Sequence, residues 1–318
     1  MDDKRDLLAI DDLSPEELKK IIHWAISAKQ DDGLFEEFMP LTGLTIGSIY
    51  EKPSTRTRVS FEVGIDKLGG NPLTLLKGDI QLGKSESIED TAAVLSRYLG
   101  AITYRCFGHS DVEKLANGST VPVINALSDK HHPCQAAADM MTIAEHFDEL
   151  SGIKVAWVGD GNNVLHDLML GATALGMEVH YAIPEGFEPD EKIVFRAKEI
   201  AKVTGGAVKM THDPVEAVKD ANVVYTDVFV SMGEEDMKDK MDAFDGFQVN
   251  EELVSNADSE YIFMHCLPAH RGEEVTDGVI DSKNSVVFDQ AENRMWAQMS
   301  LLTFLIHPAA WEAFSELH

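Results

Sequence analysis

The sequence has few cysteines and no long apolar run. Its three cysteines, Cys106, Cys134 and Cys266, are widely spaced and form no C-x-x-C pair. This pattern argues against a disulfide framework and favours a reducing cytoplasm. No run of about 18 apolar residues occurs, so we expect no membrane-spanning helix. The N-terminal stretch MDDKRDLLAI lacks the cationic and apolar regions of a secretory signal, so we expect none.

Basic residues are scarce relative to acidic ones. The chain has 27 Lys and Arg against 55 Asp and Glu, a formal net charge of −28. Nucleic acid binding needs a basic surface, so this charge argues against a nucleic acid partner. The acidic residues are spread along the chain and form no acidic tail. We hypothesise a salt-adapted source, in which screening relieves the self-repulsion of the fold. An ordinary acidic cytosolic protein is the alternative.

One stretch, EKPSTRTRVSFE from Glu51 to Glu62, has the composition of an anion site. Ser54 to Thr57 bring hydroxyls, backbone N–H groups and a guanidinium to the start of a helix predicted from 58 to 68. A helix N-terminus attracts anions, and Arg56 could hold two phosphate oxygens at once. The stretch therefore predicts a phosphate cradle. The alternative is an ordinary helix whose Ser and Thr side chains cap only their own backbone.

Short apolar runs alternate with helical stretches along the whole chain. Strands are predicted at 44–50, 73–76, 101–106, 121–125, 153–158, 178–183, 207–210, 223–226, 261–264 and 286–288. Helices are predicted at 14–30, 58–68, 87–97, 135–150 and 290–306, and one more follows Asn163 and ends at Leu175. This alternation predicts an α/β fold with two domains, each a mostly parallel sheet flanked by helices, joined by long helices. We expect domains at 1–149 and 150–318, with the C-terminal helix from about 291 packing back on the first.

The loop GDGNN follows the strand predicted at 153–158. Gly159 and Gly161 match the first two glycines of a dinucleotide-binding fingerprint, but Val164 stands at the third. An NAD-dependent oxidoreductase is therefore one alternative function.

Four further polar clusters follow predicted strands: Arg105, HPCQ from His132, DVFVSMGEE from Asp227, and HCLPAHRGEEV from His265. The carboxyl ends of parallel strands gather at one edge of a sheet, where ligands bind. Together with STRT, and in this order, these motifs strongly resemble the carbamoyltransferases. The last two resemble the ornithine carbamoyltransferase branch. The resemblance covers nearly the whole chain.

The resemblance implies transfer of a carbamoyl group from carbamoyl phosphate to the δ-amine of L-ornithine, giving L-citrulline and phosphate. It places the enzyme in arginine metabolism in the cytoplasm, without indicating synthesis or breakdown. It implies no metal and no organic cofactor, and no nucleic acid or membrane partner. It also implies a homo-oligomer, a trimer or a multiple of trimers, with sites at subunit interfaces.

The same resemblance assigns the site residues. Those matching carbamoyl-phosphate-binding positions are Ser54, Thr55, Arg56, Thr57, Gln81, Arg105, His132, Pro133, Cys134, Gln135, Cys266, Leu267 and Arg294. Those matching ornithine-binding positions are Asn163, Asp227, Ser231 and Met232. The catalytic set is Arg105, His132, Asp227, Cys266 and Arg294. Gln81 matches a position that reaches into a neighbouring subunit's site.

These residue types suit the reaction. Arg105, His132 and Thr57 would donate hydrogen bonds to the carbonyl oxygen on which negative charge develops. Asp227 and Cys266 would orient the ammonium group and accept its proton. Taken one at a time, His132 and Cys266 could equally be ordinary core residues. The side chains of Cys106 and Cys134 are expected to pack, and His131 and His270 to be structural or exposed.

Two kinds of alternative remain: a carbamoyltransferase that uses another acceptor, and a related protein without catalytic activity. The aspartate branch needs basic residues for a side-chain carboxylate, where this chain has Asp227 and the SMG sequence from Ser231. Putrescine or acetylornithine stays open, because one loop decides between these acceptors. A catalytically silent binding protein would have a broken STRT, HPCQ or HCLP motif, and all three are intact.

Overall fold

The computed structural model describes residues 4–31, 37–83, 85–231 and 240–317. The chain forms two compact units, Met1–Met141 together with Glu292–His318, and Thr142–Ala291. Both contain a parallel sheet flanked by helices, so the predicted two-domain α/β fold is confirmed. The assignment of one substrate to each domain stays a prediction.

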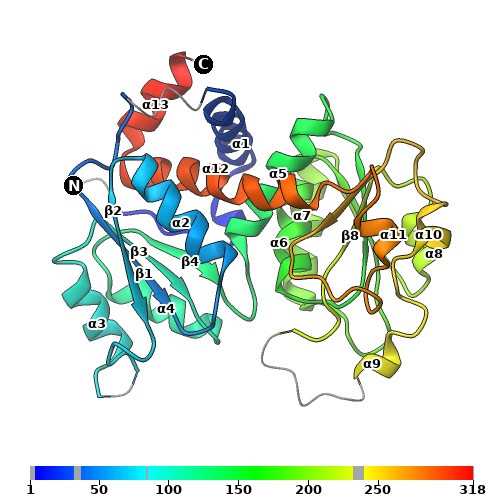
Figure 1. Cartoon of the computed structure of the whole chain (residues 1–318), viewed down its shortest axis with the longest axis horizontal. Helices are drawn as coiled ribbons and strands as arrows, with labels where there is room; N and C mark the ends of the chain where they lie inside the picture. The colour runs from blue at the N-terminus through cyan, green and yellow to red at the C-terminus, as the bar shows by residue number, and fades with distance from the viewer. Residues whose placement is uncertain (1–3, 32–36, 84, 232–239, 318) are drawn as a thin grey trace. The chain divides into compact units, whose positions relative to one another are not determined.

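A four-stranded sheet is the centre of the first unit (Figure 1). Its strands run parallel in the order β2-β1-β3-β4. They are β1 (Thr45–Tyr50), β2 (Asn71–Leu76), β3 (Ala101–Arg105) and β4 (Val123–Leu127). β1 and β3 are almost wholly buried, as expected of apolar strands in a parallel sheet covered on both faces. β2 lies at an edge, where a proline such as Pro72 is tolerated.

The first unit contains one short 3₁₀ helix and several α-helices. They are η1 (Ile10–Asp12), α1 (Pro15–Gln30), α2 (Arg56–Lys67), α3 (Ile88–Leu95), α4 (His109–Gly118), α5 (Pro133–His146), α12 (Val287–Ile306) and α13 (Pro308–Leu317). Two of them, α5 and α12, contain residues of both units. They are the long connecting helices that the sequence predicts.

Helix α1 begins as its sequence predicts. Ser14 Oγ accepts a hydrogen bond from Glu17 N at 3.2 Å, and Glu17 Oε2 accepts one from Ser14 N at 2.9 Å. This capping box satisfies two backbone donors at the start of the helix. Trp24 packs against Phe314 of α13 with ring centroids 4.4 Å apart, and α1 and α13 lie side by side in Figure 1.

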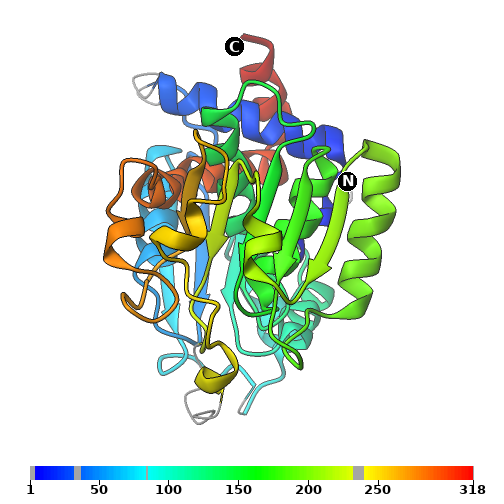
Figure 2. The same ribbon diagram turned by 90° about the vertical axis from the view of Figure 1, so that its right-hand side faces the viewer.

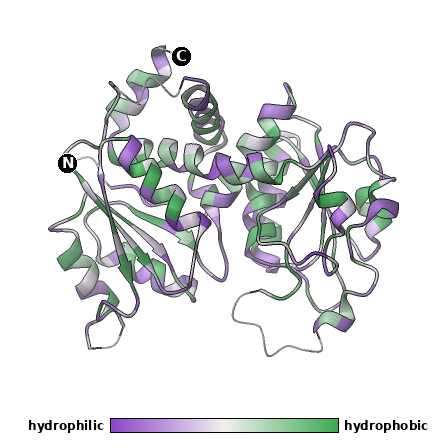
Figure 3. Cartoon of the chain, viewed as in Figure 1, coloured by the Kyte–Doolittle hydropathy of each residue, from purple (hydrophilic) through white to green (hydrophobic). Residues whose placement is uncertain are grey.

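A five-stranded sheet is the centre of the second unit (Figure 2). Its strands also run parallel, in the order β7-β6-β5-β8-β9. They are β5 (Lys154–Val158), β6 (Glu178–Ala182), β7 (Ala207–Thr211), β8 (Val223–Thr226) and β9 (Ile262–His265). The helices are α6 (Asn163–Ala174), α7 (Glu191–Thr204), α8 (Pro214–Val218), α9 (Lys240–Ala243), α10 (Glu251–Val254) and α11 (Asp277–Ile280). Nearly every residue of α6 is buried, and Figure 3 shows its hydrophobic composition.

Three elements differ from the predicted secondary structure. The strand predicted at 286–288 does not form, because Val287 already begins α12. Ser285 makes only an isolated bridge to Phe263, and Phe288 is 72% exposed although the two residues before it, Val286 and Val287, are buried. A short apolar run does not distinguish a strand from the first turn of a helix. The helix predicted at 290–306 is confirmed as α12 and ends before Pro308, but two further helices, α4 and α13, were not predicted.

Of the helices in the described ranges, not one combines the length and the apolar composition that crossing a membrane would require.

Candidate active site

In the first unit, the residues expected to bind an anion lie at the point where the strand order reverses. β1 and β3 are neighbours, and the chain continues outward from them to β2 on one side and β4 on the other. Ligands of such sheets bind beyond the carboxyl ends of these two strands. Ser54 to Thr57 follow β1, Arg105 ends β3, and Glu51 N donates to Arg105 O at 2.9 Å. The fold therefore brings the STRT segment and Arg105 to one edge.

The start of helix α2 is suited to an anion. Thr55 is its N-cap residue and makes no side-chain capping hydrogen bond. The alternative of an ordinary capped helix requires such a bond, so the structure favours the anion site. The first turn of α2 has no acidic residue, whereas α1, α3, α4 and α7 each have at least one. The N-terminal N–H groups and the helix dipole are therefore not offset by a nearby carboxylate.

His132 is a buried histidine close to three guanidinium groups. It is 5% exposed and immediately precedes α5. Burial, followed by the charges of Arg294, Arg105 and Arg56, holds the pKa of His132 well below its usual value. The imidazole is therefore neutral near pH 7. A neutral ring among three cations can donate one hydrogen bond to an anionic ligand while the guanidinium groups balance the ligand's charge.

Arg294 of α12, one of these three guanidinium groups, is hydrogen-bonded to two other predicted site residues. Arg294 is 2% exposed, and its Nη1 donates to Gln135 Oε1 at 2.6 Å while Nη2 donates to Thr57 Oγ1 at 3.0 Å. Gln135 Nε2 in turn donates to Asp139 Oδ1 at 2.8 Å. The structure thus brings Thr57, Gln135 and Arg294 together from three helices that are far apart in the sequence.

The structure also describes three other predicted residues of this unit. Gln81 is exposed, in the loop between β2 and α3, and accepts a hydrogen bond from Ser85 Oγ at 3.2 Å. Pro133 is the first residue of α5. Cys134 is buried and its thiol donates to Asn125 O at 3.6 Å, as expected of a packing residue.

The second unit has its own polar group where its strand order reverses, between β5 and β8. Asp227 directly follows β8, and Cys266 directly follows β9. Asn162 Nδ2 donates to Asp227 Oδ2 at 2.8 Å, and Cys266 Sγ donates to Asp227 Oδ1 at 3.1 Å. Asp227 is 7% exposed, so both oxygens of a nearly buried carboxylate have a donor. Such a carboxylate is an acceptor for an ammonium group and for its proton.

A buried network that the sequence analysis missed supports the backbone at Cys266 and Leu267. Leu267 N donates to His265 Nδ1 at 2.9 Å, so the His265 proton lies on Nε2, which donates to Glu274 Oε1 at 2.9 Å. Gln290 Oε1 accepts from His265 N at 2.9 Å. Leu267 itself has a φ of 56°, a conformation that non-glycine residues rarely adopt. The acidic residues of HCLPAHRGEEV were the only hint of this network in the sequence, and the sequence does not show that one of them, Glu274, pairs with His265.

The residues expected to bind the amino acid are only partly described. Asn163 is the first residue of α6 and is half-buried, and Ser231 is half-buried after β8. Met232 lies outside the described residues. Asn162, the neighbour of the predicted Asn163, contacts Asp227 and was not predicted.

The structure gives the GDGNN loop a role other than dinucleotide binding. A Cβ at Gly161 would lie 2.4 Å from Phe187 O, so this glycine is needed for packing within the protein. Asn162 Oδ1 accepts from Val164 N and Leu165 N, which are the N–H groups that a pyrophosphate would use. Both features argue against the NAD-dependent alternative.

Two groups of side chains within the described ranges could hold a metal ion by proximity. They are Asp227 with His265 and Cys266, and His270 with Glu273 and Glu274. In the first group both ring nitrogens of His265 are already used, by Leu267 and Glu274. In the second group one oxygen of Glu274 already accepts from His265 and from His270 N. His265 and Glu274, which would have to bind the metal ion, therefore already use these atoms in hydrogen bonds that position the loop after β9.

Two family models together match most of the chain. The model described as aspartate/ornithine carbamoyltransferase, carbamoyl-P binding domain, matches residues 5–145. The model described as aspartate/ornithine carbamoyltransferase, Asp/Orn binding domain, matches residues 151–305. The chain belongs to the aspartate/ornithine carbamoyltransferase family, and it is a carbamoyltransferase.

Within this family the similar proteins are named for ornithine. The chain is 54% identical over 303 residues to an ornithine carbamoyltransferase of Pyrococcus horikoshii, which covers 95% of this chain and 96% of that protein. It is 50% identical over 304 residues to a catabolic ornithine carbamoyltransferase of Thermoplasma acidophilum, covering 95% and 99%. The solved ornithine carbamoyltransferase of Pyrococcus furiosus is 53% identical, covers 95% of this chain and 97% of its own, and gives a TM-score of 0.92.

Proposed function

We propose that this carbamoyltransferase transfers the carbamoyl group of carbamoyl phosphate to the δ-amine of L-ornithine, giving L-citrulline and phosphate. The observation that carries the proposal is the Asp227 carboxylate, which is nearly buried and hydrogen-bonded by Cys266 at 3.1 Å. A carboxylate in this position attracts an ammonium group and repels the side-chain carboxylate of aspartate. The names of the similar proteins support the same acceptor.

The first unit is proposed to hold carbamoyl phosphate. The phosphate group would bind Ser54, Thr55, Arg56 and Thr57 at the start of α2, where the N–H groups and the dipole favour an anion. Arg105, His132 and the segment from Pro133 to Gln135 would bind the carbamoyl end. Because the pKa of His132 is low, its neutral ring donates to the carbonyl oxygen without adding charge. Arg294 holds Thr57 and Gln135 in place.

The second unit is proposed to hold ornithine through Asn163, Asp227, Ser231 and Met232. The δ-ammonium group gives a proton to the pair formed by Asp227 and Cys266, which leaves a neutral amine. The amine nitrogen then forms a bond to the carbamoyl carbon, and the bond from that carbon to the phosphate oxygen breaks. Phosphate leaves with the electron pair and takes up the second proton that the nitrogen loses. Leu267 is proposed to close over the reacting carbon.

We also propose a homo-oligomer, a trimer or a multiple of trimers, with Gln81 serving a neighbouring subunit. Exposed apolar side chains on α2 and on the edge strand β2 support an interface there: Val59 at 52%, Val63 at 41%, Leu73 at 41% and Leu76 at 42%. A cytoplasmic location and a salt-adapted source stay predictions from composition. Mixing Gln81→Ala subunits with Cys266→Ala subunits should restore activity if the sites are shared, whereas no recovery would argue for self-contained sites.

The acceptor is tested by a colorimetric assay of the carbamoylated product. Ornithine, putrescine, acetylornithine and aspartate are each offered with carbamoyl phosphate, at low and at molar salt. We expect ornithine to be used with a kcat/KM at least about a hundredfold above the others. The buried carboxylate opposes the side-chain carboxylate of aspartate, whereas putrescine lacks the α-carboxylate, and acetylornithine the charged α-amine, that the residues from Ser231 onward would bind. Preference for putrescine or acetylornithine would overturn the assignment. The Asp227→Asn variant should lose activity with ornithine.

A further inference from the structure

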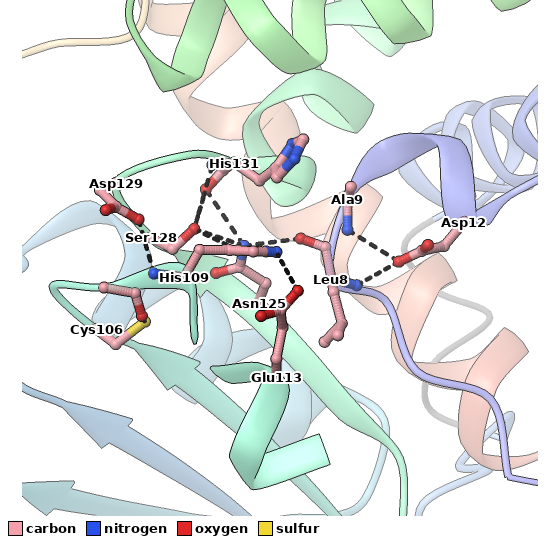
Figure 4. A network of polar contacts seen from close by, with 11 residues as sticks. Leu8, Ala9, Asp12, Cys106, His109, Glu113, Asn125, Ser128, Asp129 and His131 are labelled. Carbon is pink, nitrogen blue, oxygen red and sulfur yellow. Dashed lines mark hydrogen bonds and ion pairs between the residues drawn. The ribbon is translucent and has the colours of Figure 1, made fainter. Parts of the chain in front are cut away.

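The segment that delivers His132 and Gln135 to the site is held by a polar network outside the site (Figure 4). Between β4 and α5, Ser128 N donates to His131 O at 2.9 Å and His131 N donates to Ser128 Oγ at 3.2 Å. This turn ends at His132, whose carbonyl oxygen accepts from Gln135 N at 3.0 Å. The direction in which His132 leaves the turn therefore depends on the Ser128 hydroxyl.

A serine hydroxyl has one proton and two lone pairs. Ser128 Oγ accepts from His131 N at 3.2 Å, and Asn125 Nδ2 lies 3.2 Å from it. Asn125 Nδ2 divides its two protons among Ser128 Oγ, Leu8 O at 2.8 Å and His131 O at 3.3 Å. The Ser128 proton can go to His109 Nδ1 at 2.9 Å or to His131 O at 3.4 Å, and the shorter contact is the better one. His109 Nδ1 is therefore an acceptor, and the ring proton lies on Nε2.

His109 is well placed to influence this turn. It is the first residue of α4, and its own N–H donates to Asp129 Oδ1 at 2.7 Å, so the start of α4 is joined to the turn twice. Its side chain is 14% exposed, and Nε2 lies 3.9 Å from Glu113 Oε1. The ring of His131 lies 5.0 Å away, centroid to centroid. The charged or titratable groups near the ring are therefore Asp129, Glu113 and His131.

We propose that His109 is a positioning residue for the carbamoyl-phosphate-binding segment His132–Gln135, and that it performs this role only as a neutral imidazole. A protonated ring would direct an Nδ1–H at the Ser128 oxygen, where it would compete with the donors His131 N and Asn125 Nδ2 and would displace the Ser128 proton from His109. Imidazoles change charge between about pH 5 and 8, so the turn would loosen within that range. The inference rests on the proposed role of His132 and Gln135.

The test uses the full-length enzyme and two readouts between pH 6 and 8.5. One is the KM for carbamoyl phosphate at saturating ornithine, and the other is the Kd of carbamoyl phosphate from calorimetry without ornithine. His109→Ala removes the acceptor. His109→Asn keeps an acceptor at the δ position that does not titrate. The matched control is His307→Asn, because His307 Nδ1 also accepts at a helix start, from Ala310 N at 3.2 Å.

We expect His109→Ala to raise both constants roughly tenfold at pH 8, as for one lost hydrogen bond, with the ornithine KM nearly unchanged. His109→Asn should match wild type at pH 8 and show a smaller rise at pH 6. His307→Asn should follow wild type throughout. A wild-type Kd in His109→Ala, or a wild-type pH dependence in His109→Asn, would overturn the inference. Absence of citrulline with normal carbamoyl phosphate binding would instead contradict the proposed function.

Discussion

Replacing Arg294 by methionine removes a buried charge that is hydrogen-bonded to two of the residues predicted to bind carbamoyl phosphate. Two hydrogen bonds are lost, to Gln135 Oε1 and Thr57 Oγ1. Hydrogen bonds from a charged donor contribute about 1.5–3 kcal/mol each, which gives an upper limit of about 6 kcal/mol. Removing a buried cation also removes its desolvation penalty. We therefore expect a net loss of about 2–4 kcal/mol of stability.

The same substitution changes the protonation of His132. Burial is the largest cause of the low pKa and the charge of Arg294 is the next, so in Arg294→Met the pKa should rise but stay below its usual value. In the wild type, the unfolded chain binds a proton at His132 below about pH 6.5 and the folded protein does not. Stability therefore falls as pH decreases below that value, by at most about 1.4 kcal/mol per pH unit. In the variant this decrease should stop at a less acidic pH.

The measurement is an NMR titration of the histidine ring signals, with His132→Gln used to identify the signal of His132. Arg271→Met is the matched control, because it removes an exposed guanidinium that pairs with Asp277 and Asp281. An unchanged His132 pKa in Arg294→Met would refute the electrostatic reasoning. So would an equal shift in the control, because that would show an effect of net charge alone.

Three further predictions follow from individual contacts and from charge. Cys266→Ala should lower kcat at least about tenfold while the Kd of carbamoyl phosphate, measured by calorimetry, stays unchanged, since its sulfur contacts Asp227; an unaltered kcat would remove its catalytic role. Lys240 Nζ lies 2.8 Å from Asp160 Oδ2 and both residues are buried, so Lys240→Met should cost about 3–5 kcal/mol in urea unfolding, and the double variant Lys240→Met/Asp160→Leu should recover most of it. If the double variant is no more stable than the single one, the uncompensated charge is not the cause. With a net charge of −28, the urea midpoint should rise between low and molar salt, and equal midpoints would argue against a salt-adapted fold.

Much of the fold could be predicted because its signals are local. Ser14 and Pro15 marked the start of α1, and the alternation of apolar runs with helical stretches predicted two parallel sheets. Capping and periodicity involve residues within about four positions of one another, so sequence alone contains them. The strand predicted at 286–288 was wrong because three residues are too few to establish a period, and the run leads into the start of α12.

The sequence by itself determined which residue types follow which strand, and thereby placed Arg105 and Asp227 at the carboxyl ends of β3 and β8. The tertiary structure decided which of these residues meet. Arg294 contacts Thr57, a partner 237 positions away, and Asn162 contacts Asp227, a partner 65 positions away. Glu274 and His265 form their buried pair only once the loop after β9 has folded back. Contacts of this kind depend on how sheets and helices pack, and a one-dimensional pattern contains no information on those distances.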